Sequence, residues 1–88
     1  MSTYEFLKRL EDAGFKWFDT TQDEFDNRDV ILIDDIKEKR LLAKVSKTEP
    51  YCFEFTNLMQ QEFWAEHERA DDLVQLVLAY TRTDPNKR

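Results

Sequence analysis

The chain contains very few of the residues that build metal sites, disulfides and phosphate-binding loops. Its 88 residues include one cysteine, one histidine, one glycine and two prolines. One cysteine excludes an internal disulfide, and one cysteine with one histidine cannot supply the four ligands of a structural zinc site. A single glycine excludes a glycine-rich phosphate loop. We therefore expect no bound metal and no cofactor.

Long apolar runs are also missing, and no targeting segment is expected. A membrane-spanning helix needs about 20 consecutive apolar residues, and no stretch of this sequence approaches that length. The start, MSTYEFLKRLEDAG, has no basic region followed by an apolar segment, so we expect no signal peptide. These absences predict a cytoplasmic protein that does not contact a membrane.

Acidic residues outnumber basic ones, and aromatic residues are abundant. The chain has 19 Asp and Glu against 13 Lys and Arg, which gives a net charge of −6, and 14% of its residues are aromatic. We expect one domain, residues 1–88, with a small core rich in aromatic rings. Because an acidic surface repels a phosphate backbone, direct nucleic-acid binding is disfavoured. The one basic cluster of the sequence consists of Lys37, Lys39, Arg40, Lys44 and Lys47.

Capping residues mark the first helix. Ser2 and Glu5 have the spacing of a capping box, and Phe6 and Leu10 continue at helical spacing. Gly14 stands where a helix end needs a left-handed residue. This pattern predicts a helix over about residues 3–13.

Short runs of β-branched and alternating residues follow the first helix. Residues 15–18, 30–33, 41–46 and 51–55 are the four candidate strands, separated by polar turns. Strict alternation along the third strand places Leu42 on the sheet face away from the helices. We expect Phe18 on that face as well.

Apolar residues at helical spacing return near the end of the chain. Leu73, Leu76, Val77 and Tyr80 define one face of a helix, although residues 57–80 fit either one bent helix or two. The predicted fold is α+β, a small antiparallel sheet of three to four strands with the N-terminal and C-terminal helices packed on one face.

Two residue pairs are the only candidates for chemistry. Cys52 and His67 pair only if a sheet and a helix end bring them together, and no motif surrounds either residue. Asp34 and Asp35 are adjacent on a strand, so their side chains point to opposite faces and do not converge; we interpret them as a solvated turn. Cys52 by itself is interpreted as a small buried apolar residue. We therefore expect a protein without enzymatic activity.

Aromatic and acidic residues supply two candidate surfaces. An apolar interface for a protein partner or a homodimer is expected to draw on Trp17, Phe18, Phe25, Leu42, Phe63 and Trp64. An acidic face is expected to draw on Asp19, Asp23, Glu24, Asp26, Asp29, Asp34 and Asp35.

The last residues, TRTDPNKR, predict a helix terminus. Pro85 biases Asp84 away from helix, and the basic side chains of Arg82, Lys87 and Arg88 suit the carbonyl end of the last helix. Deleting residues 83–88 is expected to cost at most about 1–2 kcal/mol, the scale of a lost cap and of dipole contacts.

Four segments carry a resemblance to a known group of proteins. The segments are YEFLKRLEDAGF, VSKTEPY, LVQLVLAY and TRTDPNKR, and the chain resembles small uncharacterised proteins that phages and prophages of Gram-positive lactic acid bacteria encode. Asp84 departs from the usual pattern, in which proline directly follows threonine. The resemblance implies a fold and a bacterial host cell, and it assigns no activity to any residue.

Two functions follow from these observations. The first is a non-enzymatic protein-binding module that acts on a host or phage protein, and such a module is compatible with a homodimer. The alternative is a nucleic-acid mimic that inhibits a nuclease-type defence system, which requires one contiguous acidic face.

Overall fold

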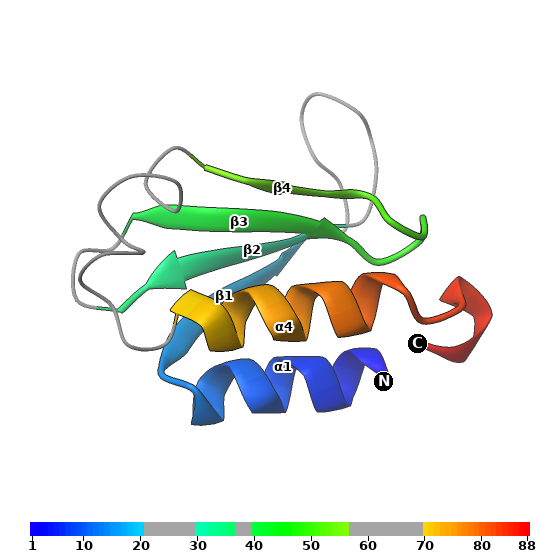
Figure 1. Ribbon diagram of the computed structural model, residues 1–88, viewed down its shortest axis with the longest axis horizontal. Coiled ribbons are helices and arrows are strands. Elements are labelled where there is room, and N and C mark those ends of the chain that lie inside the picture. The colour runs from blue at the N-terminus through cyan, green and yellow to red at the C-terminus, as the bar shows by residue number, and fades with distance from the viewer. Residues whose placement is uncertain (21–29, 37–39, 57–69) are drawn as a thin grey trace.

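The computed structural model describes residues 1–20, 30–36, 40–56 and 70–88. These residues form a four-stranded antiparallel sheet with strand order β1-β2-β3-β4 and two α-helices. Figure 1 shows both helices on the same side of the sheet, which confirms the predicted α+β fold. In chain order, the elements are α1 (Thr3–Asp12), β1 (Phe15–Thr20), β2 (Val30–Asp35), β3 (Leu41–Ser46), β4 (Phe53–Phe55), α4 (Ala70–Thr81) and the 3-10 helix η1 (Pro85–Lys87).

The ends of α1 follow the predicted capping pattern. The Ser2 hydroxyl accepts a hydrogen bond from the Glu5 backbone N–H at 3.1 Å, which satisfies one of the free amides of the first turn. At the other end, Gly14 has a φ of +89° and donates its N–H to the Glu11 carbonyl. A residue with a Cβ is strained in this left-handed conformation, so glycine allows the chain to leave α1 and enter β1 at once.

The register of β2 and β3 contains a bulge that the sequence pattern did not reveal. Ile33 pairs with Ala43, but the next residue, Asp34, pairs with Leu41, so Leu42 is the extra residue. Leu42 is 0% exposed and belongs to the hydrophobic core. Its predicted place on the face away from the helices is therefore wrong, because the bulge interrupts the two-residue alternation on which that prediction relied.

An aromatic stack joins the two helices. The rings of Phe6 on α1 and Tyr80 on α4 are parallel within 5°, their centroids lie 4.3 Å apart, and both residues are fully buried. The Tyr80 hydroxyl also shares a hydrogen bond of 2.8 Å with the Thr3 hydroxyl. A buried tyrosine needs such a partner for its polar end. The stack holds α1, which packs against β1, beside α4, which packs against β3.

The later elements agree with the predicted ones in part. The predicted strand over residues 51–55 begins only at Phe53, because Tyr51 lies in the preceding turn with a φ of +55°. The predicted apolar face of α4 is confirmed, with Leu73, Val77 and Tyr80 buried. Whether residues 57–80 form one helix or two concerns residues 57–69, which lie outside the described residues.

The end of the chain folds back onto the sheet. Pro85 begins η1, and the Asp84 carboxylate accepts a hydrogen bond from the Asn86 N–H. The Arg88 guanidinium then donates to the carbonyls of Thr81 and Ser46, both at 2.9 Å. Ser46 is the last residue of β3, so this one side chain connects the end of α4 to the end of a central strand.

Candidate protein-interaction surface

Of the two faces of the sheet, α1 and α4 cover one and leave the other without a helix among the described residues. Along β1, Phe15 is buried in the core beneath the helices, so the alternate residues Lys16 and Phe18 lie on the opposite side. The register continues this side across the sheet. Lys16 and Phe18 pair with Asp34 and Leu32 on β2. Leu32 pairs with Lys44 on β3, which pairs in turn with Glu54 on β4. We call this side the outer face; its central residues are Lys16, Phe18, Leu32, Asp34, Lys44 and Glu54.

Among the central residues of the outer face, Phe18 is the more accessible of the two apolar ones. Its side chain is 43% exposed, and the Lys16 ammonium lies 5.1 Å from the centre of its ring. This distance is typical of a cation–π interaction. Leu32, directly opposite Phe18 on β2, is half-buried and extends the apolar surface toward the middle of the sheet.

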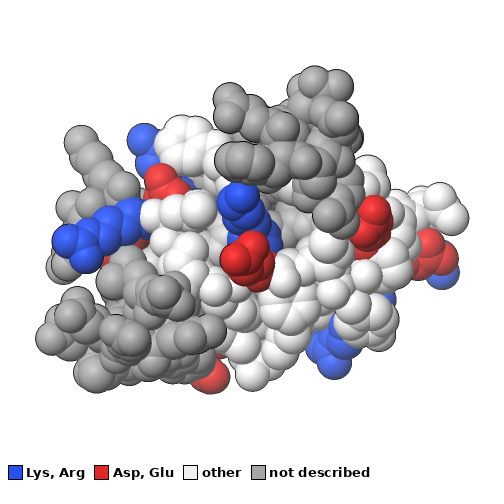
Figure 2. Space-filling view, turned by 90° about the horizontal axis from the view of Figure 1, so that it is seen from above, with Lys and Arg blue, Asp and Glu red and all other residues white. Residues whose placement is uncertain are grey.

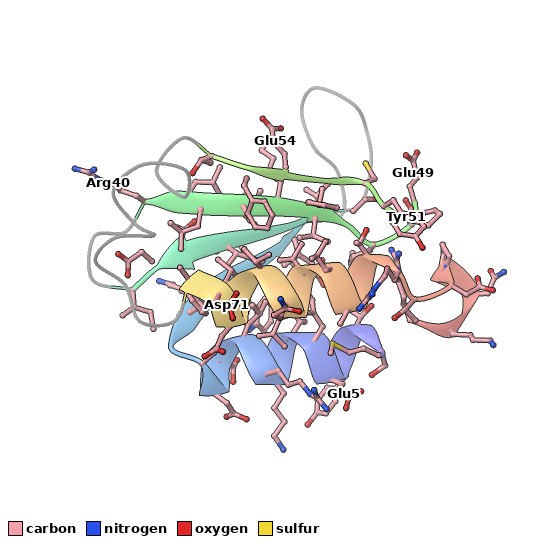
Figure 3. All side chains as sticks on the ribbon, viewed as in Figure 1. Glu5, Arg40, Glu49, Tyr51, Glu54 and Asp71 are labelled. Carbon is pink, nitrogen blue, oxygen red and sulfur yellow. The ribbon has the colours of Figure 1, made fainter. Side chains whose placement is uncertain are left out.

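Charges on the outer face are balanced in sign. Lys16 stands opposite Asp34, and Lys44 stands opposite Glu54, and opposite charges that face each other across a sheet attract. Figure 2 shows basic and acidic side chains close together in the middle of this view, and Figure 3 shows Glu54 pointing away from the helices. The outer face therefore has an aromatic residue within a mixed polar surface.

The candidate interface residues do not form one patch. Trp17 lies on the helix side of β1, where it is half-buried and its indole N–H donates to the Glu11 carboxylate at 3.0 Å. Phe18 is on the outer face, and Leu42 is in the core and cannot contact a partner. Phe25, Phe63 and Trp64 lie outside the described residues. The sequence did not place Leu32, Lys44 and Glu54 in one cross-strand row with Phe18, because that row depends on the register of the strands.

The candidate acidic residues are also dispersed. Asp19 lies on the helix side of β1 and forms a salt bridge of 2.6 Å with Lys47, whereas Asp34 lies on the outer face. Asp35 belongs to β2 and is 8% exposed, so its predicted place in a solvated turn and in an acidic face is wrong. A contiguous acidic face now depends on residues outside the described ones, namely Asp23, Glu24, Asp26 and Asp29.

The candidates for chemistry remain separate or undescribed. Cys52 is half-buried just before β4, less buried than predicted, and His67 lies outside the described residues. Within the described ranges, no three His, Cys, Asp or Glu side chains are placed to hold a metal ion. No helix in the same ranges has the length and apolar character needed to cross a membrane.

Comparison with known proteins does not assign the chain to a family. No protein-family model, no curated protein and no solved structure matches the chain.

Proposed function

We propose that the chain is a non-enzymatic protein-binding module that acts on a host or phage protein in the bacterial cytoplasm. The observation that carries the proposal is Phe18, an aromatic side chain that is 43% exposed on the sheet face that neither α1 nor α4 covers. The resemblance to phage and prophage proteins supplies the bacterial setting.

The surroundings of Phe18 suit a protein interface. Aromatic side chains are enriched among the residues that dominate binding energy, and they are usually surrounded by polar groups that keep water out. The Lys44 and Glu54 pair is placed to serve as such a rim, and its charges orient the partner more than they add affinity. The expected partner presents an apolar pocket for the Phe18 ring, bordered by polar groups.

Affinity capture with matched variants tests this function. We expect the wild-type chain to retain a stoichiometric partner from a lysate of phage-infected bacteria, and we expect Phe18→Ser to lose it. Tyr51→Ser is the control, because Tyr51 is also an exposed aromatic, at 68%, but lies in the turn before β4. Both variants should retain the circular dichroism spectrum of the wild type.

Two outcomes would contradict the proposal. One is that the wild-type chain retains no stoichiometric partner from the lysate. The other is that Phe18→Ser retains the partner as well as Tyr51→Ser does, which would place the binding surface away from Phe18.

A further inference from the structure

The two edges of the sheet differ in their protection against pairing with another strand. The edge strand β4 has three residues and follows Pro50 and Tyr51, whose backbone has a positive φ. The other edge strand, β1, has six residues, no proline and an unbroken register with β2. Short strands, prolines, bulges and charged side chains are the usual devices that keep an edge from pairing. β1 carries the charged residues Lys16 and Asp19 but has none of the other three devices, and among the described residues β2 is its one neighbouring strand.

Backbone groups of Trp17 point away from the sheet. The Asp35 N–H donates to the Arg40 carbonyl at 3.0 Å, so Asp35 directs its backbone groups toward β3. Because these groups alternate along a strand, Asp34 directs its own toward β1 and its partner Lys16. The same alternation along β1 turns the N–H and C=O of Trp17 outward, where another strand is able to reach them.

Side chains leave this edge accessible. Lys16, Phe18 and Asp19 are exposed and Trp17 is half-buried. Helices pack about 8–10 Å apart and strands about 4.8 Å apart, so two helices side by side cover four strands without extending far past the edge. Glu11 of α1 accepts the Trp17 indole N–H, so this helix packs beside β1.

A shallow hollow of about 350 Å³ follows the same edge. It is lined from both faces of β1, from α1 and from the end of β2, by Glu11, Phe15, Lys16, Trp17 and Ile36. Ile36 is 52% exposed, so this hollow includes an accessible apolar side chain. The edge thus offers both the hydrogen bonds and the apolar contact that an added strand needs.

We propose that two copies of this chain pair antiparallel through their β1 strands, around a two-fold axis at Trp17. The two four-stranded sheets then become one continuous sheet, with α1 and α4 of both copies on one face and both Phe18 side chains on the other. This inference concerns the β1 edge and does not depend on the partner proposed for the outer face.

The β1 sequence is self-complementary in this arrangement. The axis places Trp17 opposite the Trp17 of the second copy, and Lys16 opposite its Phe18. Lys16 already lies over the Phe18 ring within one chain, so the same cation–π pairing is available between copies. β1 carries one lysine and one aspartate, and no like charges face each other directly. The net charge of each β1 strand is therefore zero, so the two strands do not repel each other, although the whole chain has a net charge of −6.

A cysteine placed on the axis tests the register. The Cα atoms of a hydrogen-bonded antiparallel pair lie about 5.5 Å apart, which is within the span of a disulfide. In a Cys52→Ser background, Trp17→Cys is expected to form a disulfide-linked dimer under mild oxidation. Phe18→Cys is the matched control: its two thiols are offset along the strands, so we expect cross-linking about tenfold slower.

The wild-type chain provides a test that does not depend on a variant. Sedimentation of concentrated protein should give twice the chain mass of 10.7 kDa. Exchange of the Trp17 amide hydrogen should slow as the protein concentration rises, whereas exchange of the Lys16 amide, which faces β2, should not change. A monomer at every concentration would overturn the proposal. So would a dimer in which the Trp17 amide is unaffected, or faster cross-linking by Phe18→Cys than by Trp17→Cys.

Discussion

The Arg88 guanidinium lies over the buried ring of Tyr80, with 4.8 Å between its central carbon and the ring centre. The same ring stacks on Phe6, with 4.3 Å between the ring centres. Arg88 also donates three hydrogen bonds of 2.9–3.0 Å to the carbonyls of Thr81, Thr83 and Ser46. Because backbone carbonyls at a helix end lack partners within the helix, Arg88 caps α4 and links it to β3.

Replacing Arg88 is expected to cost more than the loss of a frayed tail. Arg88→Ala removes several hydrogen bonds from a charged donor and leaves partly buried carbonyls without that donor, so we expect the free energy of unfolding to fall by about 2–3 kcal/mol. This exceeds the upper range expected from the sequence for the whole tail. Urea denaturation monitored by circular dichroism measures the change.

Two variants sharpen the Arg88 experiment. Lys87→Ala removes a neighbouring exposed charge and should change stability by less than about 0.5 kcal/mol. Arg88→Lys keeps the charge but lacks the planar fork that reaches three carbonyls, so it should recover only a minor part of the loss. Equal effects of Arg88→Ala and Lys87→Ala would show that the guanidinium contacts contribute nothing to stability.

The bulge in β3 gives a second prediction. Leu42 is fully buried, whereas its neighbour Leu41 is only half-buried. We expect Leu42→Ala to lower the free energy of unfolding by about 2–5 kcal/mol, because it leaves a cavity in the core. Leu41→Ala should cost clearly less. Denaturant titration of both variants measures the two losses. Strict alternation predicts a larger loss for Leu41→Ala than for Leu42→Ala, and that result would contradict the observed register.

Local signals in the sequence predicted local structure well. Ser2 and Gly14 are at the two ends of α1 because capping depends on neighbouring residues alone. The order of strands and helices followed from periodicity for the same reason. These signals are carried by residues within one turn or one strand of each other, so no knowledge of the packed fold was needed.

Features that depend on distant contacts were not predictable. The burial of Leu42 depends on how β3 pairs with β2, and the burial of Asp35 depends on what packs around the end of β2. The Arg88 bond to Ser46 joins residues 42 positions apart. The outer face around Phe18 likewise exists only once four strands are in register. Its residues are ordinary in sequence, and no spacing marks them as a group.

Thr81 gives the last prediction, because its hydroxyl is buried without a hydrogen-bond partner among the residues that the structure describes. The side chain is 0% exposed at the end of α4. A buried hydroxyl without a partner loses its hydration and gains nothing in return, a cost of about 1–3 kcal/mol. Thr81→Val keeps the branched shape and removes the hydroxyl, so we expect the free energy of unfolding to rise by about 1 kcal/mol. The backbone carbonyl of residue 81, which accepts from Arg88, is unchanged by this substitution.

Thr81→Ser is the matched variant for this test, since it keeps the hydroxyl and removes the buried methyl group. It should lower stability by about 1 kcal/mol, the contribution of one buried carbon. Thermal and urea unfolding of the two variants therefore move in opposite directions if the hydroxyl is unsatisfied. A loss of stability in Thr81→Val as large as that in Thr81→Ser would instead show that the hydroxyl makes a stabilising hydrogen bond in the folded protein.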